Sequence, residues 1–250
     1  MVSDQTVLED CSYDADGRKT NVQFLSSREA ESGCEAGIVC GASTNYGIEG
    51  TDTAYPAPGA TTMTITYDEW NLPGEVLFHD ANHRSLNYVI FKRDTAGRLL
   101  SEEMRQGEIS LFQGMVDRAP PERREETAAM LEKILGDTFS STTYAYDAKG
   151  RLAKREHRMG NLGGDFTTFR YDAHDDPVED RVENRSREGG LDEIGNVRYS
   201  SERVNVQYNR FDYRYDAQGN WTERIVSFRP ESEHEFQRSN IERRAISYHG

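Results

Sequence analysis

The chain has 250 residues, of which 35% are hydrophobic, and its formal net charge is −14. So acidic a chain argues against a nucleic-acid partner, because nucleic-acid binding relies on basic patches that displace counterions. No run of about 18 apolar residues could form a membrane helix, so no membrane insertion is expected. The 13 Tyr and 10 Phe argue against disorder, whose signature is few aromatic residues.

A hairpin is the first predicted element, and its turn recurs along the chain. The hexapeptide Tyr13-Asp14-Ala15-Asp16-Gly17-Arg18 returns at 146–151 as Tyr-Asp-Ala-Lys-Gly-Arg. Asp at the first position of a type I turn can accept backbone N–H groups just ahead of it, and Gly at the fourth position can take the left-handed conformation. We therefore expect an aromatic strand, an Asp-x-x-Gly turn with a bulge, and a more charged strand.

Residues 26–62 are rich in Ser, Gly, Ala and Thr and are predicted to be a long loop insertion. Cys34 and Cys40 both lie in it, while Cys11 precedes it. A Cys34–Cys40 disulfide could tie down this loop, and free thiols are an equal alternative because the compartment is not known. No Cys-x-x-Cys occurs, which disfavours a zinc site.

Alternating residues predict strands around Met63–Tyr67, Glu75–Phe78 and Leu86–Phe91. Trp70 falls in the first of the intervening turns and could stack on a sugar ring if exposed. The second contains His79-Asp80-Ala81-Asn82-His83, which is either a polar turn or a metal-capable cluster, and the turn is favoured.

One helix is expected to interrupt the strands at 120–136. Pro120 and Pro121 open it and Gly136 closes it, the usual asymmetry of helix ends. Its apolar positions fall on one face: Thr127, Met130, Leu131, Ile134 and Leu135. The helix could bind a partner, or it could cover the apolar side of the sheet, which is the interpretation we favour.

Altered copies of the hexapeptide begin at Arg93, Tyr171 and Tyr215, and shorter traces at Tyr67 and Tyr248. The intervals between successive copies up to Tyr215 are 54, 26, 53, 25 and 44 residues, so the first four resemble one or two units of about 26.

Two acidic turns are candidate cation sites. Asp14-x-Asp16-Gly17 resembles part of a calcium loop, but position twelve is Leu25 rather than Glu. The turn at Asp172–Asp176 is acidic enough to attract a cation, although a solvated turn is the better interpretation. Trp221, at the start of a charged strand, is expected to belong to the core rather than to a ligand site.

Tyr-Asp-x-x-Gly-Arg hairpins repeated in this way resemble the YD repeats, also called Rhs repeats. That family includes bacterial polymorphic toxins, shell parts of insecticidal toxin complexes, and teneurins. The resemblance spans most of residues 13–249 and implies an exported or surface-exposed protein, although residues 1–6 do not form a signal peptide. The Asp-Pro-x-Gly-rich self-cleaving core of the toxin members has no counterpart here, so their release chemistry is not carried over.

The expected fold is therefore mainly β, a single domain over 1–250 in which an antiparallel array of YD-repeat hairpins forms a curled sheet with one inserted α-helix. The expected function is a non-enzymatic extracellular or cell-envelope scaffold or binding module with a glycan or protein ligand; the sequence sets no oligomeric state. A shell fragment of a larger Rhs-type toxin is the alternative, and a hydrolase with a site in the loops is less favoured. No nucleophile elbow, HExxH motif or P-loop occurs, so no catalytic, cofactor-binding or metal-binding residue is predicted.

Overall fold

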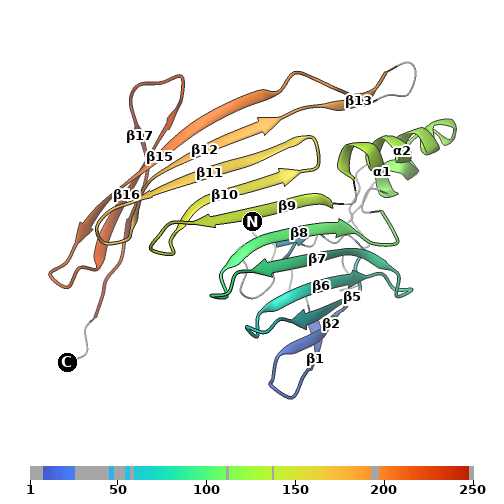
Figure 1. Ribbon diagram of the computed structural model, residues 1–250, viewed down its shortest axis with the longest axis horizontal. Helices are drawn as coiled ribbons and strands as arrows, with labels where there is room; N and C mark the ends of the chain where they lie inside the picture. Colours follow the sequence, from blue (N-terminus) through green and yellow to red (C-terminus); the bar gives the residue numbers. More distant parts are fainter. Residues whose placement is uncertain are drawn as a thin grey trace. The chain divides into compact units, whose positions relative to one another are not determined.

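A computed structural model describes residues 8–25, 45–47, 54–56, 59–110, 113–136, 138–192 and 197–247. The chain divides into two compact units, Met1–Ser140 and Ser141–Gly250, and each is considered by itself. Figure 1 shows that both consist mainly of antiparallel hairpins. The predicted mainly-β hairpin architecture is confirmed, whereas the single domain over 1–250 stays a prediction.

The first unit contains a ladder of six antiparallel strands that follow one another in space in chain order. Four pairs of neighbouring strands are joined by short turns. The turns at residues 14–18, 68–72 and 94–98 lie at one end of the strands, and the turn at 80–84 lies at the other end. The strands are β1 (Leu8–Tyr13), β2 (Lys19–Leu25), β5 (Thr62–Tyr67), β6 (Pro73–His79), β7 (Ser85–Arg93) and β8 (Leu99–Gln106). Two short strands, β3 (Asn45–Gly47) and β4 (Ala54–Pro56), pair only with each other and lie within the predicted 26–62 insertion. Cys34 and Cys40 fall outside the described residues.

An apolar ladder on one face of these strands forms the core of the first unit. The pairing register places Val22 opposite Met63, Met63 opposite Phe78, and Val76 opposite Val89. Val76, Phe78 and Val89 are fully buried. Since side chains alternate between the two faces of a strand, Leu77, Tyr88 and Arg105 lie on the opposite face.

The helical insertion comprises a short helix α1 (Gln113–Arg118), a 3₁₀ turn at Pro121–Arg123, and α2 (Arg124–Leu135). The predicted helix and its closing Gly136 are confirmed, while α1 was not anticipated. Leu131, Ile134 and Leu135 are buried, as the apolar face requires. Tyr88, Arg105 and Gln106 of the strands line a cavity together with Ala128 and Leu131 of α2. The covering of the apolar side of the sheet by this helix stays a prediction.

The second unit contains seven antiparallel strands, again in chain order: β9 (Thr138–Tyr146), which begins just before the boundary, β10 (Leu152–Met159), β11 (Gly163–Tyr171), β12 (Pro177–Ser186), β15 (Arg203–Tyr215), β16 (Trp221–Pro230) and β17 (Gln237–Arg243). Between β12 and β15 a small hairpin of β13 (Gly189–Leu191) and β14 (Val197–Tyr199) is inserted, which lengthens the spacing between two copies of the turn.

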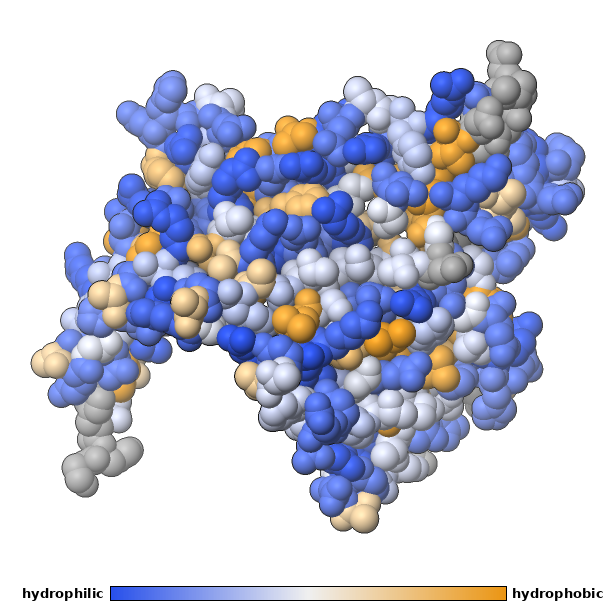
Figure 2. Space-filling model, in the orientation of Figure 1, coloured by the Kyte–Doolittle hydropathy of each residue, from blue (hydrophilic) through white to orange (hydrophobic). Residues whose placement is uncertain are grey.

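Arginine–aromatic stacking, rather than an apolar layer, dominates the second unit. Phe166 lies between the guanidinium groups of Arg158 and Arg185, each 4.9 Å from the ring centroid. Arg229 stacks on Tyr208 at 4.5 Å in the same way. Such pairs need no dry core, because both partners can keep one side in water. Figure 2 is consistent with this, since hydrophobic residues on the visible face form small patches among hydrophilic ones.

The strand order corrects one inference about the spacing. The interval of 54 residues between the first and second copies is not two repeat units, because β2 pairs directly with β5 and the described strands between them, β3 and β4, pair only with each other. The interval of 53 residues is also longer than one unit because it contains an insertion, the helices α1 and α2 between β8 and β9. The repeat unit is thus about 26 residues long. It consists of two strands, after which the chain is again at the same end of the sheet and forms the next turn of the same kind.

Candidate functional site

Within the described part of the chain, seven turns share one hydrogen-bond pattern. In each, one carboxylate oxygen of the first Asp accepts the backbone N–H groups two and four residues ahead, at 2.8–3.1 Å. We call this pattern the Asp brace. The braced turns begin at Asp14, Asp68, Asp80, Asp94, Asp147, Asp172 and Asp216.

The fourth position of every braced turn has a positive φ, and the register shifts by one residue as the chain re-enters the sheet. Gly occupies this position in four turns. Asn71 (φ 57°), His83 (φ 60°) and Asp175 (φ 65°) occupy it in the other three. The left-handed turn and bulge expected from the sequence are therefore confirmed, and they tolerate residues other than Gly.

An arginine at the fifth position closes four of the turns. Arg18 Nε donates to the second carboxylate oxygen of Asp14 at 2.6 Å, and Arg151 Nε to that of Asp147 at 2.8 Å. The backbone N–H of Arg18 and its guanidinium hold the pKa of Asp14 below its usual value. The guanidinium and backbone N–H of Arg151 do the same for the pKa of Asp147. The braces of Asp14 and Asp147 are thus bonds to a charged carboxylate, stronger than bonds between neutral groups.

Neighbouring turns at the same end of the strands are joined by the aromatic residue that precedes the next Asp. In the first unit the Tyr67 hydroxyl donates to the carbonyl of Lys19 at 2.7 Å, while Arg18 lies over the Tyr67 ring at 4.8 Å. In the second unit Tyr171 repeats both contacts, to the carbonyl of Leu152 at 2.7 Å and to Arg151 at 4.5 Å. This pair of contacts, the turn-to-turn link, explains why Tyr and Arg flank the motif.

Arg93 replaces Tyr in one copy and keeps the link by different means. Its guanidinium donates to the carbonyl of Pro73 at 2.8 Å, the position equivalent to Lys19, and to the Asp68 carboxylate at 2.5 Å. The Arg93 side chain is only 4% exposed. It therefore also supplies the charge that the turn at Asp68 lacks, because Leu72 stands where other turns have Arg.

The acidic turn at Asp172–Asp176 is closed by the next copy along the second unit. The Tyr215 hydroxyl donates to Asp172 at 2.7 Å and lies 2.9 Å from the Asp176 carboxylate, and the His174 ring stacks on Tyr215 at 4.2 Å. Burial and these two carboxylates raise the pKa of Tyr215, so the hydroxyl keeps its proton. Lys149 and Arg151 pair with Asp175. The carboxylates considered for a cation are thus engaged within the fold.

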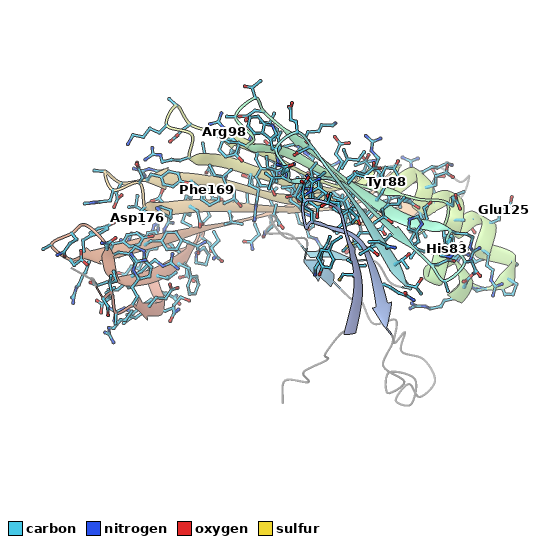
Figure 3. The ribbon with its side chains drawn as sticks, turned by 90° about the horizontal axis from the view of Figure 1, so that it is seen from below. His83, Tyr88, Arg98, Glu125, Phe169 and Asp176 are labelled. Atoms are coloured by element: carbon cyan, nitrogen blue, oxygen red, sulfur yellow. The ribbon has the colours of Figure 1, made fainter. Side chains whose placement is uncertain are left out.

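The other proposed metal clusters are also turns. Asp80 braces the turn between β6 and β7 and pairs with Arg84 at 2.8 Å, which makes His79–His83 a copy of the motif that the sequence did not reveal. Figure 3 shows His83 and Arg98 at opposite ends of the strands of the first unit. Asp16 pairs with Arg18 at 3.0 Å. Among the described residues, no three His, Cys, Asp or Glu side chains are grouped so that they could hold a metal ion.

Both tryptophans make contacts within the fold. Trp70 lies against Gly97 of the neighbouring turn, where an added Cβ would come within 3.0 Å of the indole, although 41% of the residue stays exposed. Trp221 is half-buried, with Arg244 stacked over its ring at 3.9 Å and Tyr213 at its edge. Trp70 therefore serves a turn-to-turn contact, and Trp221 packs against Arg244 and Tyr213 but is not among the buried residues of the core.

No protein-family model matches the chain, and no curated protein matches it. Among the described residues, no helix has both the length and the apolar character needed to span a membrane.

The turn-to-turn link predicts different costs for two equivalent tyrosines. Tyr171→Phe removes the hydroxyl from the carbonyl of Leu152, and we expect it to lower the free energy of unfolding by about 0.5–1.5 kcal/mol. Tyr13 occupies the same position in the first described turn, and 57% of the residue is exposed. Tyr13→Phe should leave the urea unfolding curve unchanged. Equal effects of the two substitutions would contradict the link.

His83 occupies the left-handed position of the turn at Asp80, a backbone conformation that is unfavourable for a residue with a side chain. His83→Gly should raise stability by about 0.5–1 kcal/mol, since the steric cost of this conformation exceeds the entropic cost of Gly. Gly17→Ala is the matched reverse change, because no atom lies within 4 Å of the added Cβ and only φ is strained. It should lower stability in the same unfolding assay. A loss of stability in His83→Gly would refute this assignment.

Proposed function

We propose that the chain is a YD-repeat (Rhs-repeat) scaffold or binding module that acts without catalysis, outside the cell or in the cell envelope. The observation that carries the proposal is the repetition of the Asp brace in seven turns, with Tyr or Arg linking neighbouring turns. An array in which the same polar residues recur at every turn is typical of repeat proteins, whose strands present long surfaces to a partner.

The role of the polar residues supports a non-enzymatic function. The carboxylates of Asp14, Asp80 and Asp172 are each saturated by backbone N–H groups and by an Arg or Tyr of the turns. A catalytic acid or base needs a free position from which it can exchange a proton with substrate. The Asp side chains of the turns are therefore poorly suited to catalysis. They are well suited to holding a rigid scaffold together.

One observation favours the second candidate, a shell fragment of a larger Rhs-type toxin. Among the described strands β1 pairs only with β2, and the Tyr13 ring is exposed where Tyr67 and Tyr171 each cover an arginine. A further hairpin that ends in Gly-Arg would complete the turn-to-turn link there. Such an edge is compatible with an array that continues in another segment or chain.

Fractionation of the native host and an activity screen test the main proposal together. The protein should be recovered from the medium or the cell envelope, and the purified chain should not turn over glycoside, ester, peptide or phosphodiester substrates, with or without EDTA. Recovery in the cytosol would contradict the location. Turnover that Asp172→Asn abolishes, at an unchanged melting temperature, would contradict the non-enzymatic function, whereas turnover that persists in Asp172→Asn and in Asp80→Asn would indicate a contaminant.

A further inference from the structure

A small cavity of about 160 Å³ lies in the second unit, beside the turn that joins β10 to β11. It is at the opposite end of the strands from the braced turns that begin at Asp147, Asp172 and Asp216. Three guanidinium groups, one aromatic ring and, among the described lining residues, a single carboxylate surround it: Arg158, Arg185, Arg187, Phe166 and Glu202.

We propose that this cavity binds a dianionic phosphate group, either that of a phosphomonoester or free inorganic phosphate. The inference goes beyond the function proposed above and does not depend on it, because a phosphate site can occur in a binding module, in a toxin shell or in an enzyme.

Two of the guanidinium groups are held on either side of one aromatic ring. Arg158 of β10 and Arg185 of β12 each lie 4.9 Å from the ring centroid of Phe166, which belongs to the strand between them. The contact with the ring restricts both side chains without using their N–H groups as donors. The entropic cost of ordering these side chains around a ligand is thereby reduced.

The third guanidinium is positioned by the chain just after β12 and by Glu202. The backbone N–H of Arg187 donates to the carbonyl of Leu162 at 2.7 Å, which ties this segment to the β10–β11 turn. Gly163 permits the close approach, because an added Cβ would lie 1.9 Å from the carbonyl oxygen of Arg185. Nε and one terminal nitrogen of Arg187 donate to the same oxygen of Glu202, at 3.2 and 2.8 Å, so the other terminal nitrogen takes no part in this pair.

All three guanidinium groups are accessible and keep N–H groups for a ligand. Their side chains are between 42% and 57% exposed. Within the described part of the chain, the guanidinium of Arg158 donates one hydrogen bond, to Glu156 at 3.2 Å. Arg185 uses Nε and one terminal nitrogen on Glu183, and its other terminal nitrogen lies 3.8 Å from Glu202, beyond hydrogen-bond distance. Guanidinium groups with free N–H groups match the oxygens of phosphate in geometry and charge.

Charge selects a dianion for this site. The lining arginines and the side chains that pair with them form a cluster of five cations and three carboxylates: Lys154, Arg158, Arg181, Arg185 and Arg187 with Glu156, Glu183 and Glu202. The cluster therefore has an excess of two positive charges, although the whole chain carries −14. A phosphomonoester carries about 1.5 to 2 negative charges at neutral pH and balances this excess. A carboxylate, a sulfate ester or a phosphodiester carries one charge and leaves the other positive charge uncompensated.

The size of the cavity limits what it recognises to the phosphate group itself. Its volume of about 160 Å³ is below the range of sites for drug-sized ligands, about 300–1,000 Å³. A tetrahedral anion fits this space, whereas the alcohol part of a phosphate ester has to project into solvent. Inorganic phosphate alone should therefore bind.

Calorimetric titration of the full chain in a buffer free of phosphate and sulfate tests the proposal. The probes are inorganic phosphate and phenyl phosphate, which are dianions at about pH 7.5, and the monoanions phenyl sulfate, methyl phenyl phosphate and benzoate. Both dianions should bind with a dissociation constant of about 1 mM or tighter, and each monoanion at least fivefold more weakly. Tighter binding of phenyl phosphate than of inorganic phosphate would assign the site to an ester, and equal binding would assign it to the phosphate group from either source. Failure of both dianions, or binding of a monoanion as tight as theirs, overturns the proposal.

Three arginine variants assign the binding to this cavity. Arg158→Gln and Arg187→Gln each remove one guanidinium of the lining and should weaken phosphate binding about fivefold or more at an unchanged melting temperature. Arg210→Gln is the matched control, because Arg210 also lies over an aromatic ring, at 4.7 Å, and pairs with a carboxylate at 3.2 Å, but is outside the lining. If Arg158→Gln lowers the melting temperature through the lost ring contact, Arg187→Gln alone decides the assignment. Unchanged binding in Arg187→Gln, or equal weakening in Arg210→Gln, overturns it.

Discussion

The carboxylate that opens each turn is the interaction on which the array depends. One oxygen accepts two backbone N–H groups that would otherwise face water or remain unpaired where the chain reverses. The second oxygen is left for a cation or hydroxyl donor, which comes from the same turn in the case of Arg18 and from the neighbouring turn in the cases of Arg93 and Tyr215. The same group therefore fixes the hairpin and offers a point of attachment for the next one.

Turn-to-turn attachment matters because the two units differ in how much apolar surface they bury. The first unit has the ladder of Val22, Val76, Phe78 and Val89, and this core can hold its strands together. In the second unit Val206 is the one buried hydrophobic residue among those described, so stacked arginines, ion pairs and linked turns carry more of the stability. This arrangement accounts for a chain with only 35% hydrophobic residues and 30% charged residues that still forms long strands.

The sequence predicted the features that depend on interactions between residues close together in the chain. Alternating aromatic residues and Asp-x-x-Gly identified the hairpins, and Pro121 and Gly136 bounded the helix. The copy at Asp80 was not recognised because His83 fills the left-handed position and His79 stands in place of Tyr, so neither residue signals the motif. The sequence identifies Arg93 only as the start of an altered copy, since its equivalence to Tyr depends on the carbonyl of Pro73, 20 residues away in sequence. The arginine-lined cavity of the second unit could not be predicted at all, because Arg158, Arg185 and Glu202 meet only after folding.

The most direct test of the linked turns is a double-mutant cycle between Asp68 and Arg93, measured by urea unfolding. Asp68→Asn keeps an oxygen for the backbone N–H groups and loses the charge, and Arg93→Met keeps an apolar stem and loses the guanidinium. Because the Arg93 side chain is 4% exposed and its nitrogen lies 2.5 Å from the carboxylate, we predict a coupling free energy of about 1–3 kcal/mol. Additivity of the two substitutions within about 0.5 kcal/mol would contradict an array held together from turn to turn.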